Sequence, residues 1–315
     1  MKTHSPCPVC SHQELADNGR PRVNENFPRL NERNYHIVRC RHCRFLFIDP
    51  EIDLSPAEWR ELYKQDYFAG SVKSPWQIRL NNRELNQRLA LIGRYRQNRN
   101  PQVQMKEKLL DLGCGQGYML EKAASAAYEP YGLDLARNLE PCFENRFPFF
   151  EGSLAQAAYP DAFFSVVYMD SVMEHVPHPA DAMKEIFRIL KPGGLFLMIV
   201  PNEDCLMNGL IKWVYTLSGR AEKYGKIKPF VTPYHIQGFN RKSLRTLSAL
   251  NGMSVLSLRG FGGSYPFWKA FPVFSKSWWI NLAAWPFGLM SVLTRSQVQL
   301  MLIARKDPPV AASGA

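Results

Sequence analysis

The chain is poor in acidic residues, and it lacks an apolar run of the length that spans a bilayer. Its 28 Asp and Glu stand against 39 Lys and Arg, which gives a formal net charge of +11 at neutral pH. Nucleic acid, an anionic membrane surface and a phosphate-bearing substrate are all compatible with that charge. The apolar stretch from Trp278 to Leu293 has about sixteen residues and holds Asn281, Pro286 and Gly288. It is therefore short for a transmembrane helix.

The sequence also lacks a secretory signal, internal repeats and low-complexity segments. Because the residues from Met1 to Cys7 contain no apolar stretch, we expect a cytoplasmic protein with reduced thiols and no disulfides. The length of 315 residues, with 46% hydrophobic and 21% charged residues, suits one full-sized globular domain and a smaller one.

The composition changes along the chain and indicates several segments. Residues 1–50 are rich in Cys, His, Arg and Pro, which predicts a small loop-rich module. Residues 51–104 have helical periodicity, starting with a capping pattern at Ser55 and Pro56, and form a helical connecting segment. We expect residues 105–307 to form the main domain, with an aromatic insertion at 262–296, and residues 308–315 to form a disordered tail.

Within the main domain, short apolar runs alternate with segments of helix length. This alternation is typical of βαβ units, so we predict an α/β fold with a Rossmann-like sheet of seven strands and helices on both faces. The first helices should begin near Tyr118, Ala136 and Ala180. The predicted strands are Lys108–Leu112, Pro130–Leu133, Pro148–Glu151, Phe163–Met169, Leu195–Val200, Met253–Arg259 and Gln297–Ala304.

A glycine-rich turn follows the first predicted strand, in the order Asp111-Leu112-Gly113-Cys114-Gly115-Gln116-Gly117. Glycines let the backbone take positive φ and let a ligand approach closely. The second strand ends in Asp134, 17 residues beyond Gly117, where a carboxylate can accept hydrogen bonds from the hydroxyls of a ribose. A nicotinamide-binding turn would place its third glycine at Tyr118. The actual spacing favours S-adenosylmethionine, whose ammonium group Asp111 can receive.

Further motifs follow this turn in order between about Met105 and Arg305. They are Gly132-Leu133-Asp134, the segment 163–167, Met173-Glu174-His175-Val176, the segment 188–194, and Pro201-Asn202. With these motifs the chain resembles the class I S-adenosylmethionine-dependent methyltransferases, in the group that includes ubiquinone-biosynthesis and sugar methyltransferases.

The resemblance implies which residues hold each part of the cofactor. The glycine turn would hold the methionine part, Asp134 would hold the ribose, and the residues around Gly152 would hold the adenine. Two positions depart from the family pattern. Ser153 stands where many relatives have an acid for the adenine amino group, and Ser171 replaces the first acid of a Glu-x-x-Glu-His motif that can hold a divalent ion. The expected cofactor-binding residues are Asp111, Gly113, Cys114, Gly115, Gly117, Asp134, Leu135, Gly152, Ser153, Leu154, Asp170 and Ser171.

Three histidines are candidates for a general base, because imidazole titrates near neutrality. His175 follows the fourth strand, at the edge where such sheets bind ligands, and is the first choice. The alternative is that His175 only packs this corner. His235 lies in a region that relatives place over the acceptor pocket, and His178 is the third candidate. We therefore expect His175 and His235 to be the catalytic residues.

Two Cys-x-x-Cys pairs, Cys7 with Cys10 and Cys40 with Cys43, predict a structural zinc site in the N-terminal module. Two such turns present four thiolates, which complete a tetrahedral zinc site. A redox pair is the alternative, but redox chemistry needs only one pair. The resemblance adds that similar zinc-ribbon-like modules precede methyltransferase domains acting on sugars, although the gap between the pairs is shorter here.

Two other segments allow more than one interpretation. The aromatic insertion contains Trp278, Trp279 and Trp285, and it is either a lid over the pocket or a peripheral membrane contact through residues 263–296. The helix predicted over residues 76–99 carries six arginines, which form either a solvated face or a surface for an anionic substrate.

We therefore expect a methyltransferase that acts on a small-molecule or lipid-linked acceptor, such as a polysaccharide precursor or a quinone-like compound. The alternative is a nucleic-acid or protein methyltransferase that binds its substrate through the zinc module and the basic helix. Nucleic acid is disfavoured, because residues 170–173 read Asp-Ser-Val-Met rather than the Asn-Pro-Pro-Tyr type that relatives use on base amines. A non-catalytic binding protein is a third class, against which the intact Asp111 and Asp134 argue.

Overall fold

The computed structural model describes most of the chain in seven stretches. Residues 262–274 of the aromatic insertion and 309–315 of the expected tail lie outside the described residues. The described residues are 4–23, 33–63, 75–96, 106–219, 231–232, 234–261 and 275–308.

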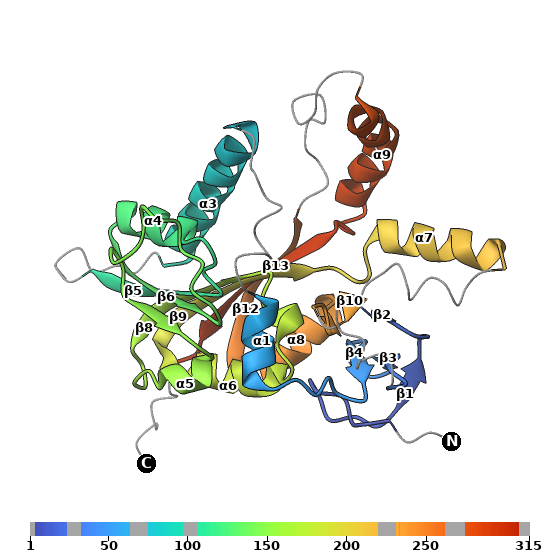
Figure 1. Ribbon diagram of the computed structural model, residues 1–315, viewed down its shortest axis with the longest axis horizontal. Coiled ribbons are helices and arrows are strands. Elements are labelled where there is room, and N and C mark those ends of the chain that lie inside the picture. Colours follow the sequence, from blue (N-terminus) through green and yellow to red (C-terminus); the bar gives the residue numbers. More distant parts are fainter. Residues whose placement is uncertain are drawn as a thin grey trace, which may run out of the picture.

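A sheet of seven strands forms the centre of the molecule (Figure 1). The strands are β5 (Glu107–Leu112), β6 (Tyr128–Asp134), β7 (Phe149–Glu151), β8 (Phe164–Asp170), β9 (Leu190–Pro201), β12 (Met253–Phe261) and β13 (Gln299–Lys306). Their order is β12-β13-β9-β8-β5-β6-β7, with β13 antiparallel to both of its neighbours, β12 and β9, and all other neighbours parallel. The predicted α/β fold and its seven strands are confirmed.

Helices cover both faces of this sheet because successive strand residues point to opposite sides. In β5, Leu109 packs with side chains of α3 (Pro75–Tyr95) and α4 (Tyr118–Ser125). The next residue, Leu110, belongs to the core on the other face. That face is covered by α5 (Leu154–Ala157), α6 (Pro179–Ile189) and α8 (Arg241–Leu250).

The helix predicted near Ala136 is wrong, since the residues between β6 and β7 form bends and turns. Pro141 disfavours a helical backbone at the residue before it, and Asn145 has a left-handed φ of 59°. Leu139 packs instead against the glycine turn, where a Cβ on Gly117 would lie 2.9 Å from its side chain.

The N-terminal module shares a small sheet with the main domain. Three of its strands, β1 (Leu15–Asp17), β3 (His36–Cys40) and β4 (Leu46–Asp49), are joined by β11 (Gln237–Gly238) at the β4 edge. A second pair joins β2 (Arg22–Val23) to β10 (Val231–Thr232). The module is therefore built onto the segment that precedes α8, and α1 (Pro56–Leu62) leads away from it with the predicted Ser55 cap.

Asn240 connects the N-terminal module to α8 through its side-chain hydrogen bonds. Its Oδ1 accepts hydrogen bonds from the backbone N–H groups of Lys242 (2.9 Å) and Ser243 (3.0 Å), which caps α8. Its Nδ2 donates to the carbonyl of Arg44 at 2.6 Å. Next to it, the rings of Phe45 and Phe239 lie 5.0 Å apart, centroid to centroid. The module and the main domain thus share one buried core.

Candidate active site and metal centre

Three carboxylates lie at one edge of the central sheet, where its parallel strands end. Asp111 is near the end of β5, in register with Gly132 of β6 and Tyr168 of β8. Asp134 is the last residue of β6, and Asp170 is the last residue of β8. Open α/β sheets bind their ligands at this carboxyl edge. The structure therefore brings together the three acids that the sequence analysis selected.

The glycine turn folds over this edge. Gly113, Gly115 and Gly117 all have positive φ, of 78°, 48° and 86°. The N–H of Gly113 donates to the Leu133 carbonyl at 2.7 Å, and the N–H of Gly115 donates to Asp134 Oδ2 at 2.8 Å. A Cβ at position 113 would lie 2.2 Å from Val172 Cγ2, so only glycine fits there without a shift of the neighbour.

Two of the three acids, Asp111 and Asp134, have raised pKa values. Asp111 is 3% exposed, and burial together with the nearby Asp170 and Asp134 raises its pKa well above the usual value. Burial also raises the pKa of Asp134, although backbone N–H groups of the turn oppose that rise. Such a cluster favours a cationic ligand, and a sulfonium or ammonium group meets that requirement.

One cation, Arg88 of α3, partly balances these charges. Its Nη1 donates to Asp170 Oδ2 at 2.5 Å and to the Tyr168 hydroxyl oxygen at 2.7 Å, and its Nη2 lies 3.4 Å from Glu84. Arg88 is buried, and its charge opposes the rise in the pKa of Asp111. The connecting helix thus supplies a side chain to the floor of the candidate site.

The residues expected at the adenine and the back of the site hold defined local roles. Ser153 caps α5 in a capping box with Gln156, and Leu154 is buried in the core. Gly152 has φ 147°, and Ser171, at φ 55°, donates its hydroxyl to Asp170 Oδ1 at 3.1 Å. The Cys114 side chain is buried in a small cluster with Leu120 and Leu139, and Leu135 is half-buried beside Asp134.

His175 stands next to this edge, at the end of a 3₁₀ turn (η2, Met173–His175). The preceding Val172 is the residue that contacts Gly113. The His175 Nδ1 lies 2.7 Å from the Tyr234 carbonyl, so we assign the proton to Nδ1 and the lone pair to Nε2. Burial and the nearby His235 lower the pKa of His175 to about 4. The ring is therefore neutral near pH 7.

His235 and Glu174 complete a polar cluster around this imidazole. The His175 and His235 rings meet edge to face, with centroids 4.8 Å apart. One donor atom each of Glu174, His175 and His235 lies within 4.8 Å of the others, a spacing that a divalent cation can also use. Glu174 is 1% exposed, and burial raises its pKa to about 8. His178 lies apart from the cluster, exposed and 3.1 Å from Glu51.

Comparison with known proteins decides the family. A family model described as a methyltransferase domain matches residues 78–258, which is more than half of the chain. The chain belongs to this methyltransferase family. The fold class and the enzyme class expected from the sequence are thereby confirmed, and S-adenosylmethionine is the cofactor that the family indicates.

Two relatives and a solved structure are similar to the chain over different lengths. A probable S-adenosylmethionine-dependent methyltransferase of Mycolicibacterium smegmatis is 37% identical over 97 residues, which span 30% of this chain and 38% of the relative. A ubiquinone biosynthesis O-methyltransferase of Methylococcus capsulatus is 34% identical over 163 residues, 49% of this chain and 69% of the relative. Among solved structures, a SAM-dependent methyltransferase from Archaeoglobus fulgidus aligns with a TM-score of 0.49 at 16% identity, covering 71% of this chain and 94% of that one.

The four cysteines of the N-terminal module converge in this methyltransferase. The sulfurs of Cys7 and Cys43 are 3.6 Å apart, those of Cys10 and Cys40 are 3.7 Å apart, and all four lie within 4.8 Å of one another. A tetrahedral site with zinc–sulfur bonds of about 2.3 Å separates its sulfurs by roughly 3.8 Å. A disulfide needs about 2.05 Å, and all seven cysteines are free. The donor set therefore fits zinc.

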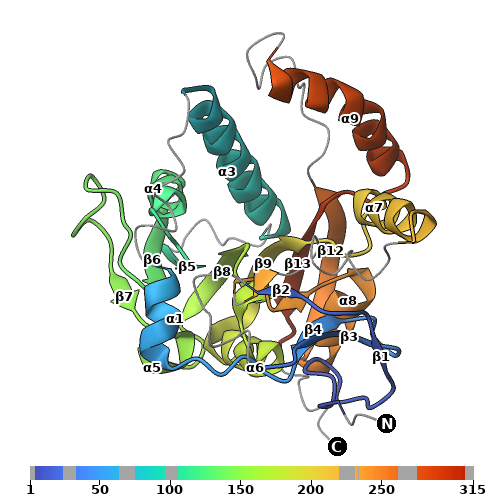
Figure 2. The ribbon, with the colours of Figure 1, turned by 45° about the vertical axis from the view of Figure 1, so that its right-hand side comes forward.

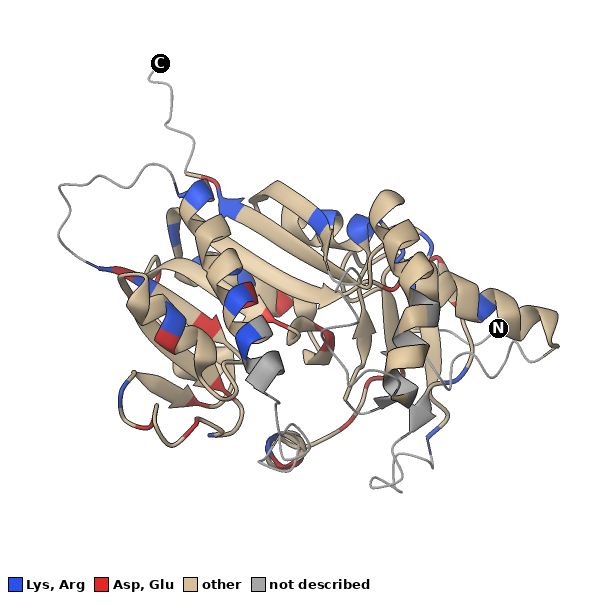
Figure 3. Ribbon diagram, turned by 90° about the horizontal axis from the view of Figure 1, so that it is seen from above, with Lys and Arg blue, Asp and Glu red and all other residues tan. Residues whose placement is uncertain are grey.

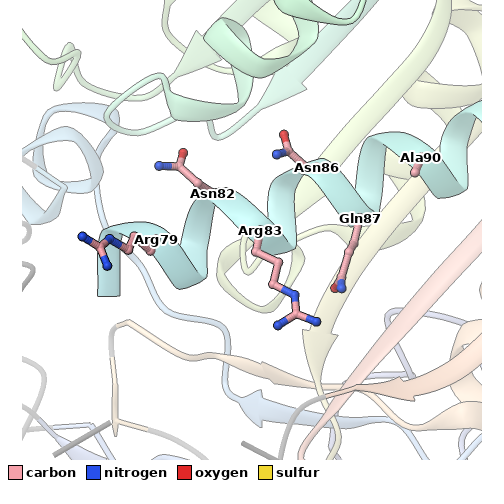
Figure 4. A pocket seen from close by; sticks show the side chains of 6 residues that line it. All are labelled: Arg79, Asn82, Arg83, Asn86, Gln87 and Ala90. Atoms are coloured by element: carbon pink, nitrogen blue, oxygen red, sulfur yellow. The ribbon is translucent and has the colours of Figure 1, made fainter. Parts of the chain in front are cut away.

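A surface hollow lies on α3 (Figure 4). The hollow has a volume of about 580 Å³, and most of its lining residues are exposed. Arg79, Arg83 and Arg94 are exposed, which is compatible with both interpretations of the basic helix, whereas Arg99 lies outside the described residues. The lining residues are Arg79, Asn82, Arg83, Asn86, Gln87 and Ala90.

Sequence analysis missed Arg88 and Tyr63 as members of the site. Arg88 had a detectable signal, because it lies three residues after Leu85 and four before Ile92, on the apolar face of α3. Tyr63 follows α1, and its ring meets that of His175 edge to face at 5.6 Å. No local pattern predicts the Tyr63 contact, since 112 positions separate the two residues along the chain.

We expect Gly113→Ala to weaken S-adenosylmethionine binding at least about tenfold, because a Cβ there collides with Val172 and the φ of 78° disfavours alanine. Isothermal titration of the folded variant measures the effect. The matched control is Gly93→Ala in α3, where a Cβ meets nothing within 4 Å, and its affinity should equal that of the parent. Unchanged binding by Gly113→Ala would disprove the assignment of this turn.

Proposed function

We propose that this protein transfers a methyl group from S-adenosylmethionine to a hydroxyl of a small-molecule or lipid-linked acceptor, either a sugar of a polysaccharide precursor or a quinone-like compound. The observation that carries the proposal is the neutral, oriented His175 beside the cofactor edge. The O-methyltransferase names of the relatives from Methylococcus capsulatus and Ralstonia nicotianae support a hydroxyl acceptor.

The cofactor edge matches the groups of S-adenosylmethionine. Asp111 and Asp170 would face the positive charges of the methionine part, and Asp134 would take the ribose hydroxyls. When bound there, S-adenosylmethionine supplies a methyl group on a positively charged sulfur, which is a strong electrophile. The chain's own contribution is to orient the acceptor against that methyl and to exclude water.

His175 would remove the proton from the acceptor hydroxyl. Its Nδ1–H is held by the Tyr234 carbonyl, so Nε2 can accept a proton while the ring keeps its orientation. His235 lies against the same ring and would contact the acceptor, because its segment returns to the sheet edge at this point. Tyr63 and Tyr234, whose rings meet edge to face at 6.4 Å, would wall this side.

The N-terminal module would bind structural zinc through Cys7, Cys10, Cys40 and Cys43. A module of this size buries little core of its own, so a metal can supply stability that packing does not. The bound metal would fix the turn that precedes β1 and the turn between β3 and β4. Through Phe45, this module supports Phe239 and the segment that carries His235.

Incubation of labelled S-adenosylmethionine and the enzyme with a fractionated cell extract tests the proposed acceptor class. We expect the label in the lipid fraction or in the small-molecule and glycan fractions, because the site offers a base for a hydroxyl. The fractions to compare are lipid, glycan, small molecule, nucleic acid and protein. Label in nucleic acid or protein alone would contradict the proposal.

We expect His175→Asn to lower kcat about 100-fold or more and to leave the Kd for S-adenosylmethionine nearly unchanged. The labelled fraction serves as the acceptor, and His178→Asn is the matched control, because His178 is exposed and lies apart from the cluster. Since the pKa of His175 is about 4, protonation of His175 should not lower the parent rate between pH 8 and pH 6. Loss of rate through protonation of His175 should begin only as the pH falls toward 4. An unchanged kcat in His175→Asn rules out the base.

Metal analysis tests the zinc site. Purified protein should contain about one equivalent of zinc, and Cys43→Ser should lower both the zinc content and the Tm, because three sulfurs hold the metal less tightly. Cys142→Ser is the control, since Cys142 is exposed and belongs to no cluster. A parent protein with far less than one equivalent would remove the proposal.

A further inference from the structure

Two helices leave the central sheet at the edge that carries the active site. α7 (Leu206–Leu217) follows the carboxyl end of β9, and α9 (Lys276–Leu293) leads into the start of the antiparallel β13. The start of α7 is joined to the segment after α9, because the N–H of Leu206 donates to the Ser296 carbonyl at 3.1 Å. The helices are in contact and stand out from the body in both views (Figures 1 and 2).

Both helices expose large apolar side chains to an unusual degree. On α7, Trp213 is 60% exposed and Leu217 is 68% exposed, and on α9 Leu293 is 71% exposed. A lid would bury its apolar side chains over the pocket, whereas these face outward. Isolated exposed apolar residues are normal, but a cluster on adjacent helices indicates a binding surface. The exposed residues of this α7–α9 surface are Trp213, Val214, Leu217, Trp279, Trp285, Phe287, Leu289, Met290, Val292 and Leu293.

The charges on the two helices are of one sign. Neither helix contains an Asp or Glu, and the sequence from Gly260 to Lys306 contains none. Lys212 lies within α7, Lys276 begins α9, and Arg295 follows it. In Figure 3, α7 projects to the right and is tan apart from a blue position. Apolar faces rich in tryptophan and bordered by cations match the headgroup boundary of an anionic bilayer.

Neither helix is suited to cross a bilayer. Within the described part of the chain, no helix has the length and apolar character of a membrane span. α9 also contains Pro286. A helix pair of this kind lies along a membrane surface, with its apolar side chains inserted among the lipids.

We propose that the α7–α9 surface seats the enzyme on an anionic lipid bilayer and turns the acceptor side of the active site toward the lipid. The chain that returns from α7 connects the two regions, because the Tyr234 carbonyl holds His175 and the N–H of Ile236 donates to the Glu174 carbonyl at 3.1 Å. The orientation of the site rests on the proposed lipid-linked acceptor, whereas the binding of the bilayer does not.

Vesicle flotation of the full chain tests this surface. The probes are vesicles of phosphatidylcholine alone and vesicles that also contain phosphatidylglycerol. We expect binding to the anionic vesicles that weakens as salt is raised, and a loss of at least about tenfold in Leu217→Asp and in Leu293→Asp. Leu250→Asp is the matched control, because Leu250 is 62% exposed on α8, away from the α7–α9 surface.

Two further measurements separate the outcomes. S-adenosylmethionine titration should be the same for all variants, so a failure of the methyltransferase assignment is recognised independently of membrane binding. Equal partitioning of parent and α7–α9 variants, or no binding to any vesicle, overturns the proposal. A dimer in sedimentation experiments that Leu217→Asp dissociates would also overturn it, since the surface would then bind a second copy.

Discussion

The repulsion among Asp111, Asp134 and Asp170 is the constraint on which much of the structure depends. Parallel strands that end at one edge bring these carboxylates together, and burial makes the charge of Asp111 and Asp134 costly. The chain relieves part of that cost with backbone N–H groups of the glycine turn and with Arg88 from α3. The remainder suits a cationic cofactor.

The N-terminal module contributes to the site through packing rather than contact with the cofactor edge. β11 completes its sheet, and Asn240 joins the α8 cap to the Arg44 carbonyl. Tyr234 and His235 lie just before β11, separated from it by Ile236. The position of the candidate base therefore depends on a segment held between two parts of the molecule.

Much of the fold and part of the site follow from the sequence. Buried strands such as β8 read as continuous apolar runs, and the turn from Asp111 to Gly117 has a spacing that selects the cofactor. Local patterns fail where distant contacts decide. The segment after Asp134 lacks its expected helix because Pro141 interrupts it and Leu139 packs on the turn. The contact between α7 and α9 could not be predicted from local patterns, because the two helices are far apart in the sequence and only the fold brings them together.

The sequence also did not distinguish Arg88 from the other arginines of its helix. Counting arginines along residues 76–99 treats them as one basic group, although Arg83 is exposed while Arg88 is buried and Arg96 pairs with Glu107. Position on the helical wheel distinguishes them, but only the sheet edge opposite Arg88 explains why a buried cation belongs there.

The segment from Asn202 to Phe239 begins and ends at neighbouring points. A β-bridge joins these two residues, and the N–H of Glu203 donates to the Phe239 carbonyl at 2.9 Å. Because its two ends are bonded to each other, this inserted segment can change in length and composition while the sheet and the cofactor edge keep their structure. Evolution can therefore exchange the part of the chain proposed to meet the acceptor, together with α7 of the α7–α9 surface, without altering the cofactor edge.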